Sequence, residues 1–78
     1  FVFFILKNAG ERIKALREER GVTQKRMAEI LDCTPSHYQK IEYGKVNISV
    51  TALYVLAEYF CVSTDYILGR TDNREVSR

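Results

Sequence analysis

CTPSHYQKIEYGK, residues 33–45, describes a short helix with one polar side. Thr34 is a favoured N-cap residue, and Gly44 is a typical residue just past a helix end. Tyr38 and Ile41 are three residues apart, so they share one apolar face of this helix. The other positions carry short or flexible hydrogen-bonding groups, which a protein core does not need. The polar side is therefore expected to face a binding partner.

The rest of the chain also predicts helices, because its apolar residues recur at intervals of three and four. Asn8 and Glu11 are spaced as an N-cap and its N3 partner, which predicts a helix start at Ala9. Gly21 is expected to end that helix with a positive φ. The predicted fold is an all-α bundle of five short helices at residues 9–20, 24–31, 35–43, 50–60 and 64–68.

The composition indicates one small globular domain: 78 residues, 46% of them hydrophobic and 28% charged. The longest apolar run, residues 1–6, is too short to cross a bilayer and lacks the cationic flank of a secretory signal. Cys33 and Cys61 lack CxxC spacing, and with one histidine no metal site is expected. These features predict a cytoplasmic protein with reduced thiols, no cofactor and no membrane contact.

The positive charge is concentrated in the first part of the chain. Residues 1–47 hold nine Lys or Arg against six Asp or Glu, whereas residues 48–78 hold three against four. A nucleophile, base and oxyanion-donor set is missing, as is a glycine-rich phosphate loop, so an enzyme is not expected. The charge distribution is compatible with a nucleic-acid partner.

The helices at 24–31 and 35–43 are joined by a turn of about three residues, which requires them to cross steeply. Ala28 is small enough to let their axes approach. This is the construction of a helix-turn-helix, whose second helix lies in the major groove of DNA. Ser36, Gln39 and Lys40 would then reach base edges, where donors, acceptors and the thymine methyl group differ between base pairs.

Three stretches, ERIKALREERGVTQKRMAEIL, TPSHYQKIEYGK and LAEYFCVSTDYILG, carry a family resemblance. Residues 11–68 resemble the helix-turn-helix domain of the Xre family, which includes lambda-type repressors and Cro-like proteins. VSTDYILGR is especially similar to repressors of prophages and mobile elements in Gram-positive bacteria. The resemblance implies a five-helix lambda-repressor-like domain, with helices two and three as the helix-turn-helix. It also implies a dimeric transcriptional regulator, a repressor, that binds a near-palindromic double-stranded operator in the nucleoid.

The resemblance also implies site residues. Gln24 would hold a DNA phosphate and brace the third helix, while Arg17 and Glu42 would form a structural salt bridge from the first helix to the end of the third. The predicted base-reading residues are Pro35, Ser36, Gln39 and Lys40. The predicted phosphate-contacting residues are Thr23, Gln24, Thr34, His37, Tyr43, Lys45 and Asn47.

The chain departs from the family pattern at three places. Asp32 stands where glycine is usual in the turn, and Asp tolerates the left-handed conformation better than most residues. Tyr38 stands where Ile or Val is usual, so its ring is expected along the core with the hydroxyl at the rim. The loop after Lys45 lacks the usual proline before Ser49.

Three parts are expected along the chain: an apolar arm at 1–8, the DNA-binding domain at 9–69 and a polar, frayed tail at 70–78. Exposed apolar area like that of the arm is rare on a small monomer. We expect residues 1–6 to pack, extended, against the fourth or fifth helix of a second subunit in a homodimer. Folding onto the same subunit, or disorder, is the alternative.

Two other functions stay open on the sequence. One is an antitoxin that masks a partner toxin and also binds its own operator. The other is a helical protein-binding module that has lost its contact with DNA. A steep fall of DNA affinity with salt would separate a regulator from such a module, because bound lysines and arginines release counterions.

Overall fold

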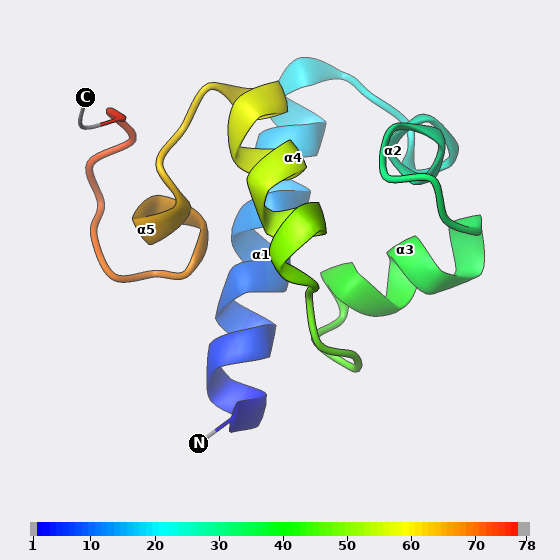
Figure 1. The fold of residues 1–78 in the computed structure, drawn as a ribbon, viewed down its shortest axis with the longest axis horizontal. Coiled ribbons are helices and arrows are strands. Elements are labelled where there is room, and N and C mark those ends of the chain that lie inside the picture. The colour runs from blue at the N-terminus through cyan, green and yellow to red at the C-terminus, as the bar shows by residue number, and fades with distance from the viewer. Residues whose placement is uncertain (1, 77–78) are drawn as a thin grey trace.

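The computed structural model describes residues 2–76 and contains five helices in one bundle (Figure 1). These are α1 (Val2–Arg20), α2 (Gln24–Ile30), α3 (Pro35–Glu42), α4 (Val50–Phe60) and α5 (Thr64–Ile67). The long α1 is central, with α2 and α3 on one side and α5 on the other (Figure 1). The all-α prediction is confirmed, and α4 has the predicted bounds.

The four helices after α1 begin where the sequence predicts, because each has a hydroxyl N-cap. In every case the cap side chain accepts a hydrogen bond, of 3.0–3.1 Å, from the backbone N–H three residues later. The capping residues are Thr23, Thr34, Ser49 and Ser63. In the turn between α2 and α3, Asp32 has a φ of 55°, so the predicted left-handed conformation is confirmed.

The predicted start of α1 at Ala9 is wrong, because the helix begins at Val2 and Asn8 lies inside it. No glycine or proline interrupts residues 2–8, and lengthening an existing helix costs less than nucleating one. The extended conformation expected for the arm is therefore also wrong for residues 2–6, while Phe1 lies outside the described residues.

The expectation of a frayed tail is wrong for residues 70–76, which fold back over α5 and α1. The backbone N–H of Ser63 donates to the carbonyl of Arg74 at 3.0 Å. Arg12 donates to the carbonyl of Thr71 at 2.9 Å, and to Asp72 at 2.8 Å. Paired arginines thus order this segment in spite of its polar composition, and residues 77–78 lie outside the described part.

The core lies where the helices meet around α1. Val50 is 86% exposed in spite of its apolar side chain, because this first residue of α4 extends beyond the core. Within residues 2–76 no helix is both long and apolar enough to cross a membrane. The buried apolar residues are Ala9, Ile13, Leu16, Met27, Ala28, Tyr38, Ile41, Leu56, Ala57, Phe60, Val62 and Ile67.

Two glycines let the backbones of α1 and α3 touch. A Cβ at Gly10 would lie 2.7 Å from the carbonyl oxygen of Ile41 and would also collide with that of Glu42. A Cβ at Gly44 would lie 2.7 Å from the Cα of Lys7, at a φ of 72° that favours glycine. The end of α3 is therefore set against α1 without a side chain between them.

Candidate nucleic-acid interface

The connection between α2 and α3 holds the two helices at close range. α2 and α3 lie in contact with each other, and Ala28 of α2 is 1% exposed. The backbone N–H of Cys33 donates to the carbonyl of Ala28 at 2.9 Å, which closes the end of α2. Thr34 then caps α3, and Pro35 occupies its first turn. The local sequence thus fixes where α3 starts and how it leaves α2.

The inward face of α3 is buried, while its opposite face is open. Tyr38, Ile41 and Glu42 are the buried residues of the helix. The four predicted base-reading residues are all exposed on the remaining surface: Pro35, Ser36, Gln39 and Lys40. Their exposure leaves these groups accessible to a partner, and their predicted role in contacting base edges stays a prediction.

The predicted phosphate contacts surround this face and are mostly exposed. Thr23 and Thr34 accept the capping N–H bonds through Oγ1, and a hydroxyl that accepts still has its own hydrogen to donate. Gln24 is half-buried. The other predicted contacts are exposed: His37, Tyr43, Lys45 and Asn47.

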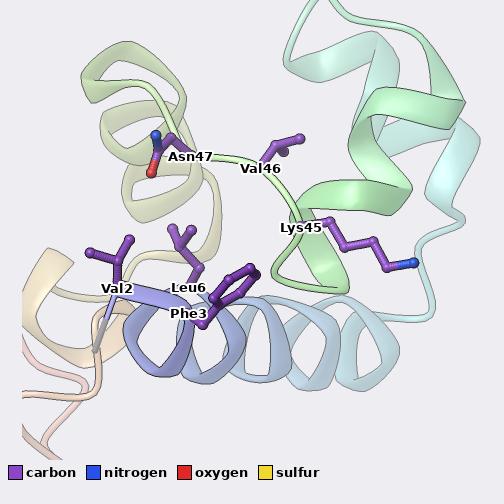
Figure 2. Close-up of a pocket in the computed structure, with 6 residues that line it drawn as sticks. All are labelled: Val2, Phe3, Leu6, Lys45, Val46 and Asn47. Atoms are coloured by element: carbon purple, nitrogen blue, oxygen red, sulfur yellow. The ribbon is translucent and has the colours of Figure 1, made fainter.

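The C-terminal end of α3 carries a small polar cluster. Gln39 Nε2 donates to the hydroxyl of Tyr43 at 3.4 Å, and the ammonium of Lys45 lies 6.0 Å from the Tyr43 ring centroid. One predicted base reader and two predicted phosphate contacts are therefore brought together. Beside them, Phe3 and Leu6 of α1 line a surface pocket together with Lys45 and Asn47 (Figure 2).

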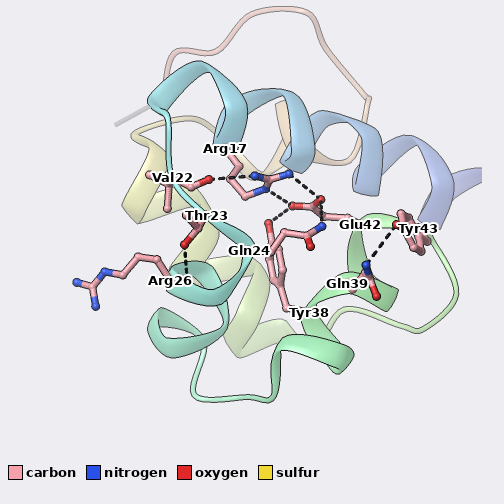
Figure 3. A network of polar contacts seen from close by, with 9 residues as sticks. All are labelled: Arg17, Val22, Thr23, Gln24, Arg26, Tyr38, Gln39, Glu42 and Tyr43. Atoms are coloured by element: carbon pink, nitrogen blue, oxygen red, sulfur yellow. Dashed lines mark hydrogen bonds and ion pairs between the residues drawn. The ribbon is translucent and has the colours of Figure 1, made fainter.

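A buried ionic network joins α1, α2 and α3 behind the exposed face (Figure 3). Arg17 Nε donates to Glu42 Oε2 at 2.7 Å, and Arg17 Nη2 to Oε1 at 3.3 Å. Gln24 Nε2 donates to Oε1 at 3.1 Å, and the Tyr38 hydroxyl donates to Oε2. Arg17 also donates to the carbonyl of Val22 at 3.0 Å. The structure thus brings both residues of the predicted salt bridge into direct contact.

The network sets the charge of Glu42. Burial pushes the pKa of this carboxyl upward, but the hydrogen bonds from Arg17, Tyr38 and Gln24 outweigh that effect and hold the pKa below its ordinary value. The same Glu42 bond raises the pKa of Arg17. The Glu42 side chain is 0% exposed, so its negative charge depends on these donors rather than on water.

The position of the Tyr38 hydroxyl differs from the prediction, and it makes Tyr38 a member of the buried network. The ring lies in the core, but its hydroxyl is buried against Glu42 rather than placed at the rim. The pKa of Tyr38 is raised, by burial first and by the neighbouring carboxylate second, so the phenol stays a protonated donor. The sequence did hold a signal for the contact between Tyr38 and Glu42. The two residues are four positions apart, and residues at that spacing are neighbours on a helix.

Comparison with known protein families agrees with this arrangement of α2 and α3. The helix-turn-helix family model HTH_3 matches residues 13–67, which include α2, the turn and α3. This chain belongs to the helix-turn-helix family. The predicted Xre-type, lambda-repressor-like assignment is confirmed, as is the predicted similarity to regulators of prophages and phages.

Relatives of this helix-turn-helix chain include proteins of Bacillus and of a Bacillus phage. It is 40% identical over 62 residues to the SPbeta prophage-derived HTH-type transcriptional regulator YonR of Bacillus subtilis, covering 80% of this chain and 57% of YonR. It is 35% identical over 60 residues to the immunity repressor protein of Bacillus phage phi105, covering 77% of this chain and 42% of the repressor. The chain thus spans about half the length of these relatives.

The fold is also that of a solved regulator. The crystal structure of the clp gene regulator ClgR from C. glutamicum superimposes with a TM-score of 0.72 at 22% identity. The match covers 82% of this chain and 83% of the ClgR chain. At this level of identity the likeness supports the five-helix architecture.

Proposed function

We propose that this protein binds double-stranded DNA sequence-specifically and represses transcription as a homodimer. The observation that carries the proposal is the two-sided construction of α3. Its inward face is held by the buried ion pair of Arg17 and Glu42. Its outward face presents exposed hydrogen-bonding groups. A rigid helix with an open polar face suits the major groove, where hydrogen-bond patterns identify base pairs.

The proposed contacts divide into two kinds. Ser36, Gln39 and Lys40 read base edges, and Pro35 contacts a thymine methyl group. The residues around them hold phosphates and set the register of the helix on the duplex. These are Thr23, Gln24, Thr34, His37, Tyr43, Lys45 and Asn47. Repression is supported by the similarity to a phage immunity repressor and a prophage regulator.

The dimer is proposed from exposed apolar residues of α4 and of the first turns of α1. Val50 and Tyr54 are 86% and 63% exposed on α4, and Phe3 and Phe4 are 77% and 68% exposed on α1. A second subunit would cover part of this area, including the predicted contact of residues 1–6. A toxin partner is the second candidate, since the same apolar α1 surface suits a protein ligand.

Selection of bound duplexes from a random pool tests the proposal. A symmetric dimer should recover a near-palindrome whose half-site centres are about one helical turn, roughly 34 Å, apart. Binding to that duplex should weaken steeply as the salt concentration rises, because binding releases counterions from the DNA and this release is less favourable at higher salt. Recovery of only asymmetric sites would contradict the symmetric dimer, and a salt-independent, unselective interaction would contradict DNA recognition.

A further inference from the structure

The Glu42 carboxylate is fully occupied by donors. An ionised carboxylate has about four lone-pair sites, two on each oxygen. Oε2 accepts from Arg17 Nε and from the Tyr38 hydroxyl, and Oε1 accepts from Arg17 Nη2 and from Gln24 Nε2. These bonds use every site of a side chain that is 0% exposed. The position of each donor is therefore determined by the others.

Gln24, like Arg17, is only partly buried within the network. It is half-buried, and its Nε2 gives one hydrogen to Glu42 Oε1 at 3.1 Å. An amide nitrogen carries two hydrogens in a fixed planar arrangement. When one hydrogen is directed at Oε1, the second must point away from Oε1. Glu42 thus determines how Gln24 presents its remaining donor.

Tyr38 determines which oxygen Gln24 uses. Its ring is 0% exposed, which leaves the hydroxyl little freedom to move away from Oε2. Without that hydroxyl, Oε2 would have an empty acceptor site in a place closed to water, and such a site is costly to leave unfilled. The amide of Gln24 and the guanidinium of Arg17 are the donors near enough to turn toward it. Such a turn would redirect the second hydrogen of the amide.

We propose that the Tyr38 hydroxyl is a positioning group for DNA binding: by occupying Oε2 of Glu42 it keeps Gln24 on Oε1, with its second amide hydrogen directed at a DNA phosphate. This inference rests on the proposed function and adds to it a buried residue that never touches DNA. Tyr38 then acts only through Gln24, so its effect must vanish when the amide is absent. That requirement separates positioning from a general contribution to stability.

A double-mutant cycle in DNA affinity tests the inference. Tyr38→Phe keeps the buried ring and should weaken binding to the selected operator by about three- to fivefold, the scale of one hydrogen bond. Gln24→Ala should weaken it by about tenfold, the scale of a charge-assisted phosphate contact. The double variant should bind like Gln24→Ala alone. Tyr59→Phe, at a partly buried tyrosine of α4 outside both the Glu42 network and the proposed subunit contact, is the matched control and should bind like the unaltered protein.

All affinities are measured at a temperature where circular dichroism shows each variant to be folded. Equal operator binding by Tyr38→Phe and the unaltered protein would overturn the inference and leave the proposed function intact. So would an undiminished effect of Tyr38→Phe in the Gln24→Ala background. An unaltered protein that binds no duplex from the pool would overturn both.

A second measurement does not depend on a variant. In the free, unaltered protein, the two side-chain amide protons of Gln24 should differ in NMR exchange rate with solvent. One is bonded to a buried carboxylate and should exchange slowly, and the other should exchange as an exposed amide. Equally fast exchange of both protons would overturn the inference even if Tyr38→Phe failed to fold.

Discussion

Arg74 holds Glu19 by two hydrogen bonds, of 2.8 and 3.0 Å, although the residues are 55 positions apart in the sequence. The same guanidinium lies 5.2 Å from the centroid of the Tyr66 ring, and the Arg74 carbonyl accepts the N–H of Ser63. Residues 70–76 thus close over the single turn of α5 and attach it to α1. The family match ends at residue 67, so this closure lies beyond the matched part of the chain.

Arg74→Ala is expected to loosen α5 without unfolding the domain, because an ion pair exposed to solvent contributes little to stability. Amide hydrogen exchange at Ser63 should become faster, since its acceptor lies in the released segment. Exchange at Met27 in α2 should stay unchanged. Glu19→Gln, which removes the same ion pair from the other side, should reproduce the result, whereas faster exchange throughout the domain would contradict it.

Arg17→Met is expected to destabilise the fold by roughly 3 kcal/mol or more, because it leaves the buried Glu42 charge without its cation. Urea unfolding measures the change. A cycle with Glu42→Gln should give a coupling energy above about 1 kcal/mol, as residues in one network do not act independently. Glu19→Gln, in the exposed pair, is the control and should destabilise the fold far less than Arg17→Met. Zero coupling would contradict the buried pair.

The stability should depend on pH through Glu42. Its pKa is lower in the folded protein than the ordinary value of 4.5, so folding favours the ionised carboxylate. That contribution is complete above the unfolded-state pKa and is lost as the pH falls through the lower folded-state pKa. The stability difference between the unaltered protein and Glu42→Gln, measured in urea, should therefore be largest near pH 7. It should shrink below about pH 4, and a constant difference would contradict this.

Lys40 and Lys45 are expected to behave differently toward DNA. Lys40→Ala should lose roughly 1–3 kcal/mol on the best site and relax the preference at one base pair. Lys45→Ala should weaken all sequences alike and reduce the slope of log affinity against log salt by about one unit. Affinities for a panel of single-base operator variants at two salt concentrations distinguish them. Uniform weakening by both substitutions would contradict the division into base readers and phosphate contacts.

Deletion of residues 1–6 should lower the mass in light scattering from dimer toward monomer, if this end of α1 forms the predicted subunit contact. The domain should stay folded, because Val2, Phe3 and Phe4 are largely exposed. Replacing Phe3 and Phe4 together by Glu keeps the length of α1 and should have the same effect. An unchanged mass at several concentrations would place the dimer contact on α4 and α5 alone.

The sequence predicted the elements whose signals are local. Thr34 and Asp32 act within a few residues of themselves, so the start of α3 and the turn before it follow from the residue types. The start of α1 did not follow, because the spacing of Asn8 and Glu11 imitates a cap, while nothing in residues 2–8 stops the helix.

The tail and the buried network depend on contacts between distant residues. No pattern near Arg74 indicates that Glu19 is its partner. The predicted Arg17–Glu42 pair came from a family resemblance, and that pattern has no tyrosine at position 38. The role of its hydroxyl therefore appears only when the side chains of α1, α2 and α3 are placed together.

Gly10 has a consequence for how this domain is able to change over evolution. It lets α1 meet the carbonyls of Ile41 and Glu42 directly, so the joint between scaffold and recognition helix is made of main chain. Substitution of the surface side chains leaves these main-chain atoms unchanged. If Ser36, Gln39 and Lys40 read bases as proposed, substitutions there would alter operator preference without changing the docking angle of α3. The domain is in this sense modular: new specificities are accessible by a few surface substitutions, while the joint is constrained to glycine.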